Sequence, residues 1–308
     1  MATKKAASTK KTTAKKPATK PAKTTVRTVS ASAKPAAKVE KADVKVVRPV
    51  AAERKSQALP GNIVNIVFAE LFGTFGLVLV ALFAAKETGA LYVGLFLAVM
   101  VMAVGAVSGS HLNPAVTLAK WTMRQLKSVL LPFYWGAQFL GAMLAVIVIN
   151  WVTNNSLHLD FSHLGSMNWA IFAVELVGAT VFMFGLAAAT NRRTLGTGSA
   201  AIGVGLSLVA GLVVATSLLA NVQGTVDTSN VTSVDKLPHE LRVKGATLNP
   251  AVALAATEQS DSVFTGSQAD KNEKQISRLS LEVVLGSMIG AVIGGNLYLM
   301  IAGSRRDQ

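Results

Sequence analysis

The sequence predicts an all-α membrane protein with six transmembrane helices and two re-entrant half-helices arranged as an inverted repeat. Three observations support this fold class. Six apolar runs are long enough to cross a bilayer, two shorter apolar stretches share one motif, and each motif falls in a different half of the chain. Of the 308 residues, 51% are apolar, 15% are charged and none is cysteine. The lack of cysteine excludes a disulfide scaffold and cysteine-based metal or catalytic chemistry.

The first 58 residues differ in composition from the rest of the chain. They hold 16 of the 30 Lys and Arg residues but only three acids, and they lack Phe, Trp, Tyr, Leu and Ile. Such a segment cannot bury enough apolar surface to offset chain entropy, so we expect residues 1–58 to form a disordered basic tail. No apolar core occurs before residue 62, so we expect no cleaved signal peptide. The tail's positive charge favours acidic lipid or nucleic acid as a partner.

Six apolar runs follow in order along the chain. A bilayer core requires about 20 helical residues, and the runs cover residues 62–85, 89–107, 128–152, 168–190, 198–220 and 279–303. Basic residues follow the second, fourth and sixth runs, namely Lys120, Arg124, Lys127, Arg192, Arg193, Arg305 and Arg306. Together with the tail they fall on one face, which the positive-inside rule makes cytoplasmic. We therefore expect a multi-pass protein of the cell membrane with both termini in the cytoplasm.

Two shorter apolar stretches, residues 108–121 and 244–257, both read Leu-Asn-Pro-Ala-Val-x-Leu-Ala. A second sequence similarity relates Glu70-Leu-Phe-Gly-Thr in the first run to Glu175-Leu-Val-Gly-Ala in the fourth. Each half of the chain therefore contains three spans and one short segment. Because three is odd, the two halves enter the membrane from opposite sides, as in an inverted repeat.

The short segments are predicted to be half-helices that begin at Asn113-Pro114 and Asn249-Pro250. Asn is a favoured N-cap and Pro is favoured at the first helical position. About nine residues at 1.5 Å each give roughly 13 Å, which is half of a membrane. Two such helices entering from opposite faces meet near the midplane. Non-helical backbone is tolerated there only where it is buried in protein or lines a watery cavity, so the arrangement predicts a pore.

These motifs, together with residues 69–74 and 134–142, resemble the major intrinsic protein family, the aquaporins and glycerol facilitators. The likeness covers roughly residues 60–303 and excludes the tail. It implies an aquaporin-like channel domain at 59–308, with repeats at about 62–152 and 168–303. It also implies a passive channel for water and small uncharged solutes such as glycerol. The expected assembly is a homotetramer in the lipid bilayer, without cofactor or enzymatic activity.

The resemblance assigns the pore centre to the two motifs Asn113-Pro114-Ala115 and Asn249-Pro250-Ala251. The two Asn amides, with the positive ends of the half-helices, would hold a solute oxygen and disfavour cations.

Four further residues are expected to support the loops. Glu70 and Glu175 lie inside apolar runs, where a carboxylate needs partners. We expect both to accept hydrogen bonds from the re-entrant loops, and a proton relay is the alternative. Gln138 is expected to contact loop backbone. His111 is expected to be a packed loop histidine, with a proton-sensitive gate as the alternative.

The sequence departs from the family pattern at the outer filter. An arginine usually follows the second motif in this family, and here that position is Val252. The other filter positions fall on Val93, Leu212 and Ala246. We therefore expect an apolar filter, wider than that of a strict water channel, with Arg242 and Lys244 as candidates to replace the missing arginine.

Two other functions remain open at this point. One is a proton-coupled or gated transporter that uses Glu70 and Glu175. The other is a membrane anchor whose basic tail binds nucleic acid or acidic lipid. No arrangement of nucleophile, metal ligands or phosphate-binding glycines supports an enzyme.

Overall fold

The computed structural model describes residues 59–84, 88–154, 158–192, 194–229, 231–266 and 275–303. The predicted tail at 1–58 lies outside the described residues, as do Arg193, Arg305 and Arg306. Within the described part, six helices are long and apolar enough to cross a membrane. They are α1 (Ile63–Phe83), α2 (Gly89–Ser108), α4 (Leu131–Thr153), α5 (Trp169–Asn191), α6 (Thr197–Gly224) and α10 (Leu281–Ala302). The six predicted spans are confirmed.

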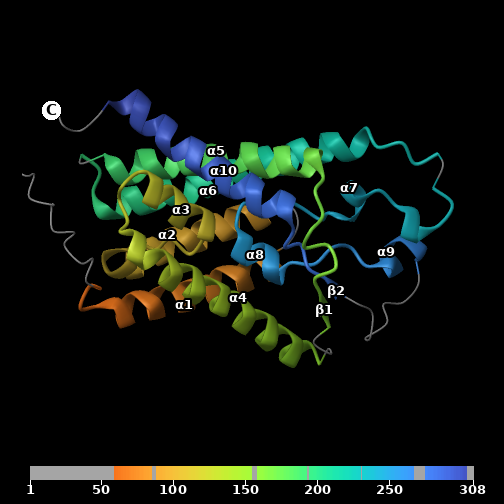
Figure 1. The fold of residues 1–308 in the computed structure, drawn as a ribbon, viewed down its shortest axis with the longest axis horizontal. Coiled ribbons are helices and arrows are strands. Elements are labelled where there is room, and N and C mark those ends of the chain that lie inside the picture. Colours follow the sequence, from red (N-terminus) through yellow and green to blue (C-terminus); the bar gives the residue numbers. More distant parts are fainter. Residues whose placement is uncertain are drawn as a thin grey trace, which may run out of the picture. The chain divides into compact units, whose positions relative to one another are not determined.

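Two half-helices lie among the long helices in Figure 1, α3 (Pro114–Thr122) and α8 (Pro250–Ala255). The order α1, α2, α3, α4 in the first half recurs as α5, α6, α8, α10 in the second. Shorter elements fill the connections. They are η1 (Ser128–Leu130), β1 (Leu159–Asp160), η2 (Val234–Lys236), α7 (His239–Arg242), α9 (Asp261–Thr265) and β2 (Gln275–Ile276).

The two halves pack against each other through their half-helices. The half-helix α3 of the first half lies on α10 of the second, and α8 lies on α4 and α1. Helices α2 and α6 form a further contact between the halves. Each half-helix is therefore held by long helices of the opposite half, as the inverted repeat predicts.

Glycines allow the long helices to approach closely. A Cβ atom on Gly94 of α2 would lie 2.6 Å from the Gly205 carbonyl oxygen of α6. On α10, a Cβ on Gly286 would lie 2.7 Å from the Phe172 oxygen of α5, and a Cβ on Gly290 would meet the Leu176 carbonyl. Small residues provide this contact in membranes, where apolar burial does not drive helices together.

The connections gather at two ends of the helices. At one end, Gln125 Nε2 donates to Asn191 Oδ1 over 3.0 Å and joins the basic segment after α3 to the end of α5. We call this the basic end. At the other, the loop end, β1 pairs in parallel with β2, with Leu159 opposite Gln275 and Asp160 opposite Ile276. Figure 1 shows β1, β2, α7 and α9 together at the loop end.

The second half-helix is shorter than the sequence predicts. It ends at Ala255, because Ala256 is extended and its carbonyl accepts a hydrogen bond from Arg278 N over 2.9 Å. Thr257 then forms a β-bridge with Ser277. Pairing with a segment 20 residues further along the chain thus replaces the last helical turn, and no local sequence pattern encodes that pairing.

Candidate functional site

The starts of the two half-helices are joined by a reciprocal pair of hydrogen bonds. Asn113 Nδ2 donates to the Leu248 carbonyl over 2.9 Å, and Asn249 Nδ2 donates to the Leu112 carbonyl over 2.9 Å. Each amide nitrogen carries two N–H donors, so one donor of each asparagine remains for another acceptor. The structure thus brings together the two motifs that the sequence predicts to meet.

The same local geometry positions both asparagines. Each is an N-cap with extended backbone, and its Oδ1 accepts from the N–H of Ala115 over 2.8 Å or of Ala251 over 2.9 Å. The preceding residues, Leu112 and Leu248, have left-handed φ values of 50° and 52°. Non-glycine residues seldom adopt this conformation. This conformation turns the carbonyl of each leucine toward the asparagine of the other half-helix.

Glu70 and Glu175 hold the loops that lead into these turns. The Glu70 oxygens accept from the backbone N–H groups of His111 over 2.9 Å and Leu112 over 2.8 Å. The Glu175 oxygens accept from Thr247 N over 2.8 Å and Leu248 N over 2.7 Å. Both carboxylates are fully buried, and a buried carboxylate is retained only when its oxygens are hydrogen-bonded in this way.

Gln138 is linked to the re-entrant loop through Glu70. Its Nε2 donates to Glu70 Oε2 over 2.8 Å and to Thr117 Oγ1 over 2.9 Å, so among the described residues it hydrogen-bonds to two side chains. The loop N–H groups are already accepted by Glu70, so the expected backbone bond of Gln138 stays a prediction. Gln138 ties the Glu70 carboxylate to α3.

His111 is buried beside the junction. Its Nδ1 lies 3.2 Å from Thr117 Oγ1, and its ring lies 4.7 Å from the Tyr134 ring. These contacts agree with a packed loop histidine. The residue also lines the cavity described next.

A cavity of about 830 Å³ extends from the asparagine junction to the loop end. Asn113 and Asn249 line it, together with all four predicted filter residues, Val93, Leu212, Ala246 and Val252. Residues of the loop end also line it, among them Lys244, Thr257, Gln259 and Gln275. Apart from Lys244 and Arg278, its wall carries no Lys, Arg, Asp or Glu among the described residues. Glu70 and Glu175 are not among the residues that line it.

Arg278 is the residue of this cavity that sequence reasoning missed. It lines the cavity but is only 2% exposed, and its Nε, Nη1 and Nη2 have no hydrogen-bond partner among the described residues. Burial lowers the pKa of Arg278, whereas the nearby charges of Glu175, Glu258 and Glu282 raise it. A guanidinium keeps its proton in proteins, so the wall carries a buried positive charge. The sequence did contain one indication of its role. Arg278 precedes the last span, at the end of the helices where the positive-inside rule predicts few basic residues.

The two predicted substitutes for the missing arginine lie in different places. Arg242 forms an ion pair with Asp261 over 2.8 Å and donates to the Val234 carbonyl over 2.6 Å, and it does not line the cavity. Of the two candidates, Arg242 is thus occupied by contacts within the loop end. Lys244 does line the cavity, and its Nζ lies 3.5 Å from Thr257 Oγ1. Desolvation lowers the pKa of Lys244.

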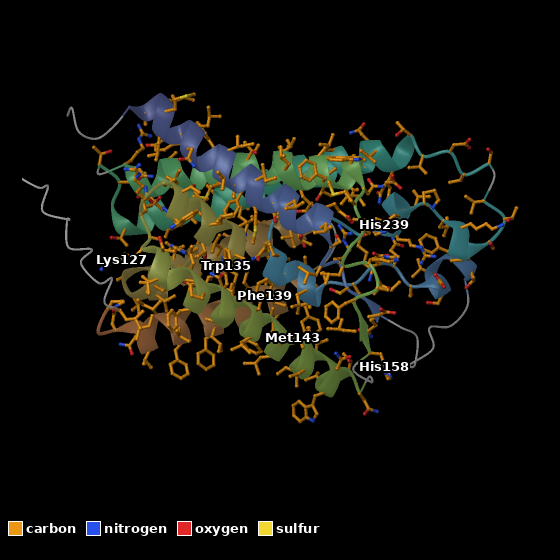
Figure 2. All side chains as sticks on the ribbon, in the orientation of Figure 1. Lys127, Trp135, Phe139, Met143, His158 and His239 are labelled. Carbon is orange, nitrogen blue, oxygen red and sulfur yellow. The ribbon has the colours of Figure 1, made fainter. Side chains whose placement is uncertain are left out.

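Figure 2 shows Lys127 at the basic end and His158 and His239 at the loop end, with Trp135 on α4 between them. Trp135 Nε1 donates to the Pro114 carbonyl over 3.1 Å, which fixes the first turn of α3 against α4.

Comparisons with known proteins identify relatives of this chain. The family model described as major intrinsic protein matches residues 84–222. Aquaporin NIP2-3 from Zea mays is 32% identical over 219 residues, which are 67% of this chain and 64% of the maize protein. The chain thus spans less than two thirds of that relative's length. Aquaporin Z from Photorhabdus laumondii is 34% identical over 167 residues, which are 46% of this chain and 71% of that protein.

Among solved structures, the X-ray structure of the aquaglyceroporin from Plasmodium falciparum aligns with a TM-score of 0.48 at 19% sequence identity. The alignment covers 77% of this chain and 95% of that chain.

Proposed function

This chain belongs to the major intrinsic protein family, and on that basis we propose that it is a passive channel for water and small uncharged solutes. The observation that carries the proposal is the cross-bonded pair Asn113 and Asn249 on the wall of the cavity. Each asparagine keeps one N–H donor for an oxygen of a passing solute. The two helix N-termini add positive potential at the same place, which disfavours cations and hydronium.

The constriction on the loop side of this junction is proposed to consist of Val93, Leu212, Ala246 and Val252, with Arg278 as its charged member. The first four offer apolar wall, which suits the carbon backbone of a solute such as glycerol. Arg278 is buried and has no hydrogen-bond partner among the described residues, so its guanidinium needs water or solute oxygens as acceptors. Arg278 would therefore supply the donors and the positive charge that the family usually places at position 252.

A proton-coupled transporter is less well supported than a passive channel. Each oxygen of Glu70 and Glu175 already accepts a backbone N–H, both side chains are fully buried, and neither lines the cavity. A relay requires a carboxylate that exchanges protons with water. We therefore propose that these two residues hold the re-entrant loops.

Stopped-flow light scattering on proteoliposomes of the full chain tests the function. We expect faster shrinkage in an impermeant osmolyte than in empty vesicles, and faster re-swelling in glycerol or urea. A pH difference across the membrane should not drive net solute flux at equal concentrations. A coupled transporter would instead accumulate solute under that gradient.

A matched pair of variants assigns the flux to the cavity. Val252→Trp should block it, because Val252 lines the cavity at 8% exposure. Val263→Trp is the control, because Val263 is 62% exposed in α9 and does not line the cavity. Equal flux in the two variants would contradict the proposed route.

Assembly, orientation and the tail stay predictions. We propose a homotetramer in the cell membrane with the basic end in the cytoplasm. We also propose that residues 1–58 bind acidic lipid. Deleting the tail should leave the flux unchanged and weaken binding to vesicles that contain anionic lipid. A loss of flux on deletion would instead favour a direct role of the tail in transport.

A further inference from the structure

Four side chains from four separate segments meet at the loop end, beside the cavity. His163 lies between β1 and α5, His239 begins α7, Glu258 follows α8, and Glu282 lies in the first turn of α10. His163 Nδ1 lies 2.9 Å from Glu258 Oε1, and His239 Nδ1 lies 3.5 Å from the same oxygen. The ligand atoms of His163, His239 and Glu258 all lie within 4.8 Å of one another.

This donor set and spacing are typical of a zinc-type site. Two imidazole nitrogens and one carboxylate oxygen bind Zn²⁺ at about 2.0–2.2 Å, and a tetrahedral ion places its ligands about 3.3 Å apart. The distances of 2.9 Å and 3.5 Å lie on either side of that value. The third pair of ligand atoms, on His163 and His239, lies at most 4.8 Å apart. The two nitrogens need to approach each other by about 1.5 Å at most, which side-chain rotation can supply.

Glu282 orients one of the histidines for this role. His239 Nε2 lies 3.0 Å from Glu282 Oε1, so the other ring nitrogen, Nδ1, is the one that faces Glu258. Glu282 Oε2 is itself held by Ser166 Oγ and by the backbone N–H of Asn168, both at 3.3 Å. A carboxylate that accepts the outer N–H of a ligating histidine is the common second layer of zinc sites.

Glu258 provides an independent indication of a missing ligand. Its side chain is only 2% exposed, yet its Oε2 has no hydrogen-bond partner among the described residues. Its backbone is fixed, because Glu258 N donates to the Ile276 carbonyl over 2.9 Å. Burying a carboxylate with one oxygen unpartnered is costly, and a cation bound at Oε1 would offset the buried negative charge. The histidine side chains, exposed by 35% and 19%, leave a path from solvent.

Nearby charge does not prevent cation binding. Arg278 adds one positive charge to this region. The negative charges of Glu258, Glu282 and Glu175 stabilise that charge and raise the pKa of Arg278. The negative charges of Glu258 and Glu282 thus act both on Arg278 and on the place where an ion would sit.

We propose that His163, His239 and Glu258 bind one divalent transition-metal ion of the zinc type, with Glu282 as the positioning residue for His239. Three protein ligands leave a fourth position for water. The ion joins the loop before α5, the connection between α6 and α8, and the segment after α8. Thr257 and Gln259, the neighbours of Glu258, line the cavity, so the metal braces the rim of the proposed pore.

Titration of the purified full chain with CoCl₂, followed by competition with ZnCl₂, tests the site. Tetrahedral Co²⁺ absorbs strongly in the visible range, and the chain has only four histidines and no cysteine to compete for it. We expect one equivalent per chain, displaced by Zn²⁺. His163→Ala and His239→Ala should each raise the Kd at least tenfold, Glu258→Gln should do the same, and Glu282→Gln should raise it 10- to 100-fold.

His158→Ala is the matched control, because His158 is an exposed histidine of the same end and lies outside the cluster. It should bind like the wild type. Elution volume and melting temperature without added metal show whether each variant is folded, and His163 is exposed enough for its replacement to be tolerated. The proposal is overturned if the wild type shows no tetrahedral absorption, or if folded His163→Ala and His239→Ala bind cobalt like the wild type. The histidines would then only form hydrogen bonds to the two carboxylates.

Discussion

Glu70 and Glu175 perform the same task at equivalent places in the two halves. Each carboxylate accepts hydrogen bonds from two consecutive backbone N–H groups of a re-entrant loop. The second residue of each pair is a leucine with left-handed φ. The loops cross the membrane interior without helical hydrogen bonds, so these carboxylates satisfy donors that lipid cannot. The junction of the two half-helices thus depends on residues that do not line the cavity.

Glu175→Gln should destabilise the fold by about 1–3 kcal/mol, because the amide offers one acceptor where two N–H groups need acceptors. The melting temperature in detergent should fall, and the same change at Glu70 should have a similar effect. Asp227→Asn is the control, because Asp227 is exposed. An unchanged melting temperature in both glutamine variants would contradict the supporting role.

Asn249→Asp tests the junction itself. Aspartate keeps the oxygen that caps α8 but loses the N–H that binds the Leu112 carbonyl. It also places negative charge where the helix ends attract anions. We expect water flux to fall by about tenfold, since a lost donor at a constriction costs about 1.4 kcal/mol or more. The measurement is osmotic shrinkage normalised to the protein in each vesicle.

Arg278→Met removes the only arginine that lines the described cavity wall. We expect cation and proton leak to rise, because the positive barrier is lost while Glu175, Glu258 and Glu282 remain. A pH-sensitive dye inside vesicles under a potassium diffusion potential measures the leak. Arg278→Lys should leak less than Arg278→Met. Arg242→Met, which affects an ion pair outside the cavity, should match the wild type.

Val252→Arg would place a second guanidinium at the family's usual position. We expect glycerol flux to fall more than water flux. Val252 lines the cavity and is 8% exposed, so a larger side chain there narrows the cavity. Light scattering in glycerol and in an impermeant osmolyte gives the two rates. If both rates stay unchanged, position 252 is not part of the constriction.

Gly290→Ala tests the close approach of α5 and α10. Its Cβ would collide with the Leu176 carbonyl, and overpacking of this kind costs about 1–3 kcal/mol. Gly136→Ala is the matched control on α4, because no atom lies within 4 Å of its added Cβ. The two variants should therefore shift the melting temperature differently, with a clear loss only for Gly290→Ala.

The sequence predicts the helices better than the connections. Apolar runs and two Asn-Pro starts specify six spans and two half-helices, because bilayer thickness and helix capping act locally. Where α8 ends depends on pairing with Ser277 and Arg278, which no local pattern encodes. The same pairing brings Arg278 to the cavity and Glu258 to the histidines. Both features were therefore missed, although the four predicted filter residues do line the cavity.

The hydrogen bond from Asn113 to the Leu248 carbonyl spans 135 positions of the chain. During synthesis, Asn113 is therefore made long before the carbonyl that its amide binds. Until then its amide needs a temporary acceptor, such as water or a membrane-insertion factor. The centre of the molecule thus cannot reach its final arrangement before residue 249 is made, and a chain that stops before residue 248 lacks both hydrogen bonds of the junction.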